Sequence, residues 1–94
     1  MGEDKAQEIG LAVLAYVAGD ADVLGRFMNE TGLDAGDLRA RASEPALLGA
    51  LLDFIFANES LLLAFCKMEE LPVNAIIKAR AALPGGESAL EGWA

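Results

Sequence analysis

Apolar residues recur along the chain at intervals of three and four residues, which is the period of an α-helix with one buried face. No segment alternates between polar and apolar residues in the manner of a half-buried β-strand. The pattern therefore predicts an all-α fold, a compact orthogonal bundle of five to six short helices in a single domain. The expected helices cover about residues 4–18, 21–31, 35–42, 44–58, 59–68 and 73–83.

Capping residues mark the ends of these helices. Asp20, Asp34 and Ser43 are the expected N-caps of the second, third and fourth helices, because a short polar side chain can accept a hydrogen bond from the first turn. Asn58 is expected to do the same for the fifth helix. Gly19 is expected to close the first helix in the left-handed conformation, which glycine tolerates best.

Two of the helices are apolar over most of their circumference. The fourth leaves only a narrow sector that is not apolar, which holds Gly49 and Asp53. The first is apolar on two sides between Ile9 and Val17. We expect the fourth helix to lie at the centre. Two such helices in a short chain indicate either a dense bundle or a surface that a second chain completes.

The 94 residues suffice for one domain with a single core. Residues 1–83 are predicted to form the helical domain. Pro84-Gly85-Gly86 ends the last helix, so residues 84–94 are predicted to be a flexible C-terminal tail.

The charge balance argues against several classes of partner. Fifteen acidic residues against seven basic ones give a net charge of −8, which repels the phosphates of nucleic acids and of anionic membranes. A helix-turn-helix formed by the third and fourth helices is therefore a weak hypothesis, and we expect no nucleic-acid partner. The most apolar run, residues 45–68, is interrupted at Asp53 and again at Asn58-Glu59-Ser60, so we expect no membrane-spanning helix.

The compartment follows from two features. Acidic residues stand near the N-terminus, where a secretory signal needs positive charge, so export is not expected. The only cysteine is Cys66, which excludes an intrachain disulfide and suits a reducing environment. We therefore expect a cytoplasmic protein.

Three stretches, LAVLAYVAGDADVLGRFMNETGL, DLRARASEPALLGALLDFIFANESLLLAFC and ARAALPGG, resemble a known family. The segments GD-x-x-x-LGRF and Leu-Leu-x-Phe carry most of the likeness, which extends over about residues 9–86. The chain is similar to a family of short all-helical bacterial proteins of unknown function. The resemblance implies a cytoplasmic helical fold and assigns neither an activity nor a functional residue.

The stretch that begins at Asp20 has two features of a calcium loop, an Asp-x-Asp start and Gly25 at the sixth place. The fifth place is Leu24, however, and the twelfth, which requires a bidentate glutamate, is Thr31. Helical spacing of apolar residues also continues through the segment. We interpret Asp20 as an N-cap and expect no metal ion. The sequence contains no histidine, which is the commonest zinc ligand.

No combination of residues indicates an enzyme. Without histidine the commonest general base is missing. Cys66 stands among apolar residues, which predicts a buried and unreactive thiol. Glu69 and Glu70 are neighbours on a helix and point about 100° apart, so they are interpreted as a solvated pair. We expect no catalytic residue and no cofactor.

Three arginines are candidates for an anion site or an ion pair. Arg39 and Arg41 point in nearly opposite directions on a short helix, and we expect both to face solvent near its C-terminal end. Arg80 lies inside an apolar arc, where a guanidinium must extend to water along its aliphatic stem or meet a carboxylate. The sequence favours extension to water. The alternative is a structural ion pair with Asp53.

Leu63 faces the polar side of the fifth helix, and Phe56 and Leu48 are candidates to extend it into an apolar patch. These three residues are the predicted partner-binding surface. The favoured function is a non-enzymatic protein–protein interaction module or a homo-oligomer, with an unknown partner. The alternative is a small-ligand-binding or carboxylate-based enzyme domain with a pocket near Asp53 and Arg80, to which Tyr16 could contribute.

Overall fold

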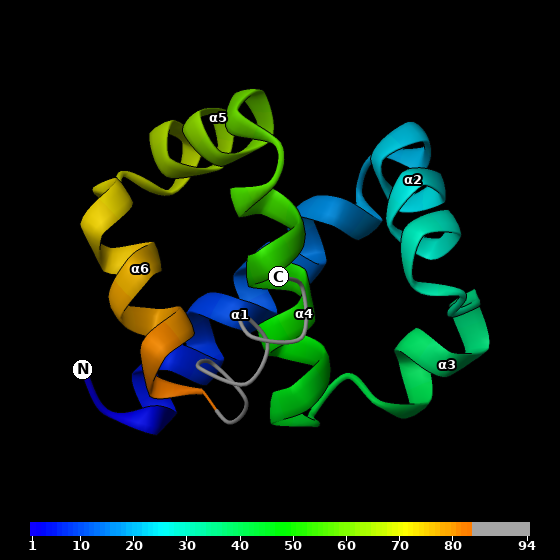
Figure 1. Ribbon diagram of the computed structural model, residues 1–94, viewed down its shortest axis with the longest axis horizontal. Coiled ribbons are helices and arrows are strands. Elements are labelled where there is room, and N and C mark those ends of the chain that lie inside the picture. Colours follow the sequence, from blue (N-terminus) through cyan, green and yellow to red (C-terminus); the bar gives the residue numbers. More distant parts are fainter. Residues whose placement is uncertain (84–94) are drawn as a thin grey trace.

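The described part of the chain folds into α-helices. The computed structural model describes residues 1–83 and contains six helices and no strand within that range (Figure 1). Residues 84–94, for which a tail is predicted, lie outside the described residues. The prediction of an all-α bundle is confirmed. The helices are α1 (Glu3–Ala18), α2 (Ala21–Thr31), α3 (Ala35–Ala40), α4 (Pro45–Phe56), α5 (Glu59–Glu69) and α6 (Val73–Ala82).

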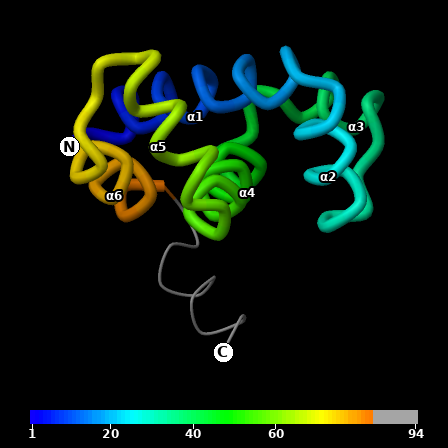
Figure 2. Tube along the Cα trace, turned by 90° about the horizontal axis from the view of Figure 1, so that it is seen from above, coloured from blue at the N-terminus to red at the C-terminus, as the bar shows by residue number. Residues whose placement is uncertain are grey.

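Helices α1 and α4 cross near the middle of the molecule (Figure 1). Helices α5 and α6 lie on one side of this pair, and α2 and α3 lie on the other, as a second view confirms (Figure 2). The radius of gyration is 12.1 Å, close to the value of about 12 Å for a compact chain of this length. Helix α4 therefore has neighbours on several sides, as its apolar circumference requires.

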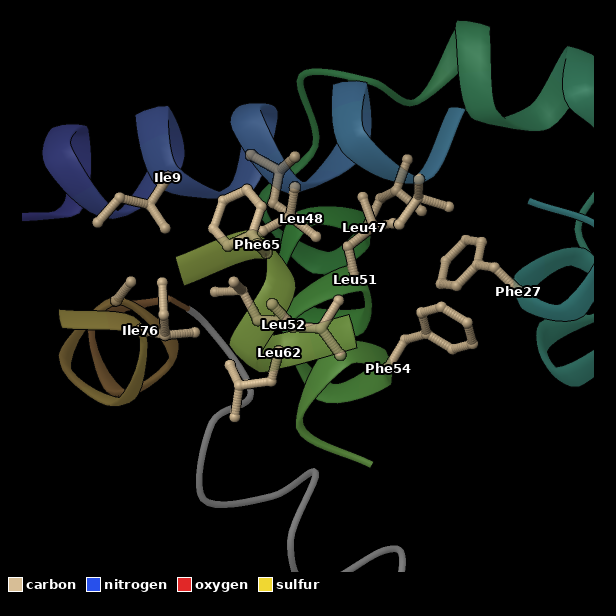
Figure 3. Close-up of a cluster of buried hydrophobic side chains, with 14 of the residues drawn as sticks. Ile9, Phe27, Leu47, Leu48, Leu51, Leu52, Phe54, Leu62, Phe65 and Ile76 are labelled. Carbon is tan, nitrogen blue, oxygen red and sulfur yellow. The ribbon is translucent and has the colours of Figure 1, made fainter. Parts of the chain in front are cut away.

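The core is built around α4. Leu51, Leu52 and Ile55 are each 0% exposed, although they point to different sides of the helix. Side chains from α1, α2, α5 and α6 surround Leu51 and Leu52 (Figure 3). Of the two arrangements considered from the sequence, a dense bundle therefore holds for α4, and its own chain covers this helix.

Gly10 allows α1 and α4 to approach closely. A Cβ atom added at Gly10 would lie 2.8 Å from the Cβ of Leu48, which is closer than real Cβ atoms come. Leu48 is 1% exposed and lies inside this contact. The prediction that Leu48 belongs to a partner-binding surface is wrong, because its side chain faces Gly10 of α1 and not solvent.

Two helical glycines are expected to respond to alanine in opposite directions. Gly25 is exposed in α2, and an added Cβ there meets nothing within 4 Å. Gly25→Ala should raise the free energy of unfolding by about 0.5–1 kcal/mol. Gly10→Ala should lower it by about 1–2 kcal/mol, because the clash with Leu48 outweighs the gain in helix propensity. Urea unfolding measures both changes, and a stabilised Gly10→Ala variant would contradict the close approach.

Two of the predicted N-caps are present. One carboxylate oxygen of Asp20 accepts hydrogen bonds from the backbone N–H groups of Asp22, at 3.0 Å, and Val23, at 3.2 Å. Asp34 accepts from the N–H of Asp37 at 2.8 Å, and the Asp37 side chain accepts from the N–H of Asp34 at 3.0 Å, which completes a capping box. Both aspartates thus satisfy backbone groups at the start of a helix.

Two predicted helix ends are wrong. Gly19 ends α1 with a right-handed φ of −78°, and the left-handed glycine is Gly32, with a φ of 77°, after α2. The N-cap of α4 is Glu44 and not Ser43, and its side chain makes no capping hydrogen bond. Pro45 takes the first helical position, which suits its fixed φ, so the cap falls on the residue directly before it.

Helix α2 is attached to α4 and to the start of α5 through two neighbouring side chains. The ring of Phe27 meets that of Phe54 edge to face, with centroids 5.2 Å apart (Figure 3). Arg26 donates to Oδ1 of Asn58, whose own amide donates to the carbonyl oxygen of Phe54 at 2.8 Å. Asn58 holds the N-cap position of α5 as predicted, but its side chain joins helices and does not cap.

Helix α5 ends at Glu70, whose backbone is left-handed with a φ of 55°. This conformation is unfavourable by about 1–2 kcal/mol for a residue with a Cβ atom and is unstrained in glycine. Glu70→Gly should therefore raise the free energy of unfolding by about 1 kcal/mol. The control Ala64→Gly, at an exposed position inside the helix, should lower it by about 1 kcal/mol. Urea unfolding distinguishes the two, and equal losses would contradict the strained geometry.

Candidate functional site

An ion pair between Asp53 and Arg80 joins α4 to α6. The Arg80 Nε donates to Oδ1 of Asp53 at 2.6 Å, and Nη2 donates to Oδ2 at 3.1 Å, in the bidentate geometry of strong pairs. The two side chains are only 12% and 23% exposed, for Arg80 and Asp53 respectively. The favoured expectation, that Arg80 extends to water, is wrong, because Asp53 lies within reach across the helix contact.

Gly49 makes room for this pair on α4. A Cβ atom added at Gly49 would lie 2.9 Å from Nη1 and 3.2 Å from Cζ of Arg80. The narrow sector of α4 that is not apolar thus receives the guanidinium of α6. Both carboxylate oxygens of Asp53 are already bound by that guanidinium, so the arrangement holds two helices together and offers a ligand no free carboxylate.

A second feature is a depression along α1. Helix α1 lies at one edge of the molecule when it is seen from above (Figure 2). Its volume is about 460 Å³, and it opens to solvent. The ring of Tyr16 packs edge to face on Phe65 of α5, with centroids 5.6 Å apart, and so connects the two helices that border it. We call it the α1–α5 groove, defined by Ala12, Ala15, Tyr16, Gly19, Asp20, Met68 and Glu69.

The sequence of α1 accounts for the apolar character of the groove. Residues 9–19 contain no charge, although only one side of that stretch is needed for the core. Leu11 is 45% exposed, and Ala15 is also exposed, on the outward side of the helix. Met68, at the end of α5, is 57% exposed. The groove is therefore apolar surface that the described chain leaves open to water.

Carboxylates lie at both borders of the groove. Asp20 follows α1, and Glu69 is the last residue of α5. Asp20 accepts hydrogen bonds from backbone N–H groups only, and neither carboxylate takes part in an ion pair within residues 1–83. The groove thus combines an apolar floor with unneutralised negative charge at its rim.

The predicted patch of Leu48, Phe56 and Leu63 does not form. Leu48 is in the core, and Phe56 is partly buried and packed against it. Leu63 is 51% exposed, as expected for its polar-side position. Leu63 and Met68 point about 140° apart around α5, so Leu63 does not extend the groove. The groove residues that the sequence reasoning missed include Ala15 and Met68, and the uncharged run 9–19 is the signal that could have found the first.

Burial raises the pKa of the Cys66 thiol, which is 7% exposed in α5. The folded chain therefore keeps the thiol proton at a pH at which the unfolded chain loses it. The contribution of Cys66 to the free energy of unfolding is complete below the unfolded-state pKa and is lost as the pH rises through the folded-state pKa.

Two measurements check the state of this thiol. A thiol-specific reagent should modify the native protein slowly and the urea-unfolded protein rapidly. The free energy of unfolding of the natural chain should fall more steeply above about pH 8.5 than that of Cys66→Ala. Rapid modification of the native protein would contradict the buried, protonated thiol.

The remaining candidates have ordinary surroundings. Arg41 forms an exposed ion pair with Glu44, with Nε and Oε2 3.2 Å apart, and Arg39 is exposed in the last turn of α3.

Among residues 1–83, no group of three or more histidine, cysteine, aspartate or glutamate side chains is arranged to hold a metal ion. No single helix there is long and apolar enough to span a membrane; α4 and α5 together reach that length but are bent by 111°.

Within residues 1–83 the geometry describes a helical domain with a packed core, a structural ion pair and an open apolar groove. Comparison with known proteins adds the family. The model of DUF3572, described as a protein of unknown function, matches residues 3–86, and the chain belongs to this family. The predicted relationship to a family of unknown function is thereby confirmed. No curated protein and no solved structure matches the chain.

Proposed function

We propose that this protein is a non-enzymatic protein–protein interaction module and that the α1–α5 groove is its docking surface. The observation that carries the proposal is the open depression on α1 and α5, whose floor is lined mainly by apolar residues. Met68, in the groove, is 57% exposed, whereas Leu51 of α4 is 0% exposed. Exposed apolar side chains that line a depression make it a candidate for contact with another molecule.

The composition of the groove supports a protein partner. Tyr16 is an aromatic residue with an apolar body and a polar tip, a type enriched in the centres of protein interfaces. Met68 is flexible and polarizable, so it can adapt to the side chains that it meets. The small side chains of Ala12 and Ala15 let a partner approach the backbone of α1.

The alternative of a ligand-binding or carboxylate-based enzyme domain near Asp53 and Arg80 has less support. Those two side chains bind each other at 2.6 Å and 3.1 Å. Tyr16 belongs to the groove and not to their surroundings. The groove itself is open, whereas small-molecule sites usually enclose most of the ligand surface.

The test compares two matched alanine-to-glutamate variants. Ala15→Glu places a bulky, charged side chain in the groove, and Ala46→Glu makes the same change at an exposed position in the first turn of α4, outside the groove. Each tagged protein is used for affinity capture from native lysate with quantitative mass spectrometry. Sedimentation velocity over a range of protein concentrations accompanies the capture, to detect self-association.

The proposal expects a set of captured proteins, or a self-associated species, that Ala46→Glu retains and Ala15→Glu loses. Circular dichroism establishes first that both variants remain folded. Identical capture profiles and identical monomeric sedimentation for all three proteins would overturn the proposed function.

A further inference from the structure

We infer that the occupant of the α1–α5 groove is a cationic amphipathic helix of a partner protein, an inference that rests on the proposed function. The groove offers an apolar floor flanked by Asp20 and Glu69, one from each bordering segment. A matching ligand therefore has apolar side chains on the face that it buries and basic side chains beside them. Such helices bind in grooves through apolar anchors spaced three and four residues apart.

The negative charge of the rim favours a partner with positively charged side chains. Within residues 1–83, no basic side chain neutralises Asp20 or Glu69. The protein as a whole carries a net charge of −8, which adds a long-range field of the same sign. Lysine or arginine on a partner gains ion pairs at the rim and faster association, whereas an acidic segment is repelled.

The shape of the floor favours a helix. Ala12, Ala15 and Gly19 lie on one side of α1 at successive helical turns, so there is little side-chain bulk along this line. Helix axes approach to about 8 Å where contacting side chains are small. From Ala12 to Gly19 the stripe is about 10 Å long, which matches about two turns of a partner helix. Met68 forms the opposite wall and adapts to the apolar anchors.

A second copy of this chain is a poorer occupant. Its own groove would bring another Asp20 and another Glu69, and each copy carries a charge of −8. Like charges placed across an interface oppose association. The same sign of charge disfavours nucleic acids and anionic membranes. A cationic protein segment is the partner for which both the floor and the rim are complementary.

The experiment uses two synthetic helical peptides of about 18 residues as probes. Both carry leucine at helical spacing on one face; one carries lysine on the other face, and its counterpart carries glutamate. Fluorescence anisotropy with labelled peptides measures the dissociation constants at about 50 mM and 300 mM salt, between which ion pairs at an exposed rim weaken.

Two double variants separate the rim from general charge effects. Asp20→Asn with Glu69→Gln neutralises the rim, and asparagine keeps the N-cap of α2. Glu30→Gln with Glu59→Gln removes the same charge at exposed positions outside the groove. Met68→Ala tests the apolar wall of the groove, and this side chain is 57% exposed, so the fold does not depend on it.

We expect the lysine peptide to bind at least about tenfold more tightly than the glutamate peptide at low salt. Neutralising the rim should weaken binding about fivefold, and the control pair less than about twofold. Met68→Ala should also weaken binding of the lysine peptide, because it removes apolar contact area. Failure of the lysine peptide to bind, equal binding of both peptides, or equal effects of the two double variants would overturn the inference.

The outcomes also separate this inference from the proposed function. If the lysine peptide does not bind while capture still depends on Ala15, the groove is a docking site for another class of partner, and only the cationic helix is overturned. If sedimentation shows a dimer that Ala15→Glu dissociates, a second copy occupies the groove, which also overturns the cationic helix. If Ala15→Glu changes neither the set of captured proteins nor the sedimentation of the protein, the proposed function itself is overturned.

Discussion

Phe27→Ala is expected to lower the free energy of unfolding by about 3–5 kcal/mol, the largest effect of any substitution considered for this protein. Phe27 is 0% exposed, and its ring packs edge to face on Phe54 with a centroid distance of 5.2 Å and an interplanar angle of 77°. The substitution removes the transfer free energy of the ring, leaves a cavity and abolishes the aromatic contact. Urea unfolding followed by circular dichroism measures the loss.

The position of α2 makes this loss spatially uneven. Helices α2 and α3 lie on the far side of the α1–α4 pair from α5 and α6 (Figure 1). The buried residues of α2 are Phe27, 0% exposed, and the smaller Val23, 7% exposed. Amide hydrogen exchange in Phe27→Ala should therefore accelerate most in α2 and least in α4.

The milder variant Phe27→Leu serves as the control, because it keeps most of the apolar volume and should lose only about 1–2 kcal/mol. A loss below about 1 kcal/mol for Phe27→Ala, or acceleration spread evenly over all helices, would contradict the role of Phe27 as the anchor of α2.

Local features of the fold could be predicted from the sequence because their partners are near in the chain. Asp20 accepts from N–H groups two and three residues later, and the Asp34–Asp37 capping box closes over three residues. Such contacts depend on composition within a single turn. The predicted cap of α4 at Ser43 is wrong, because the preference of proline for the first helical position places the N-cap at Glu44, directly before Pro45.

Contacts between helices could not be predicted in the same way. When a helix is apolar over most of its circumference, its sequence does not show which side faces which neighbouring helix. The sequence therefore predicts Leu48 on the surface, whereas it lies against Gly10 of α1. Asp53 and Arg80 are 27 residues apart, and the choice between pairing and extension to water depends on how α4 and α6 meet. The groove depends on the meeting of α1 with the end of α5, and no periodicity within either helix reports it.

The Asp53–Arg80 pair provides the second large effect. Asp53→Ala and Arg80→Ala should each lower the free energy of unfolding by about 2–3 kcal/mol, because each leaves the other charge largely buried without its strongest partner. The side chains are 23% and 12% exposed, so water can relieve part of the penalty. The double variant should lose only slightly more than either single variant, which gives a coupling free energy of about 2 kcal/mol in a double-mutant cycle. Additive losses would contradict a direct interaction.

Gly49→Ala tests the position of the Arg80 guanidinium, because its expected effect on the free energy of unfolding has opposite signs with and without Arg80. In the natural chain, Gly49→Ala places a Cβ atom 2.9 Å from Nη1 of Arg80, so the guanidinium must move away from Asp53 and the protein should lose about 1–2 kcal/mol. In the Arg80→Ala background the space is empty, and Gly49→Ala should raise the free energy of unfolding by about 0.5–1 kcal/mol through helix propensity. Urea unfolding of the four proteins measures both changes. Because helix propensity is the same in both backgrounds, a reversal of sign isolates the contact between Gly49 and Arg80, and the same sign in both would show that the guanidinium does not lie against α4.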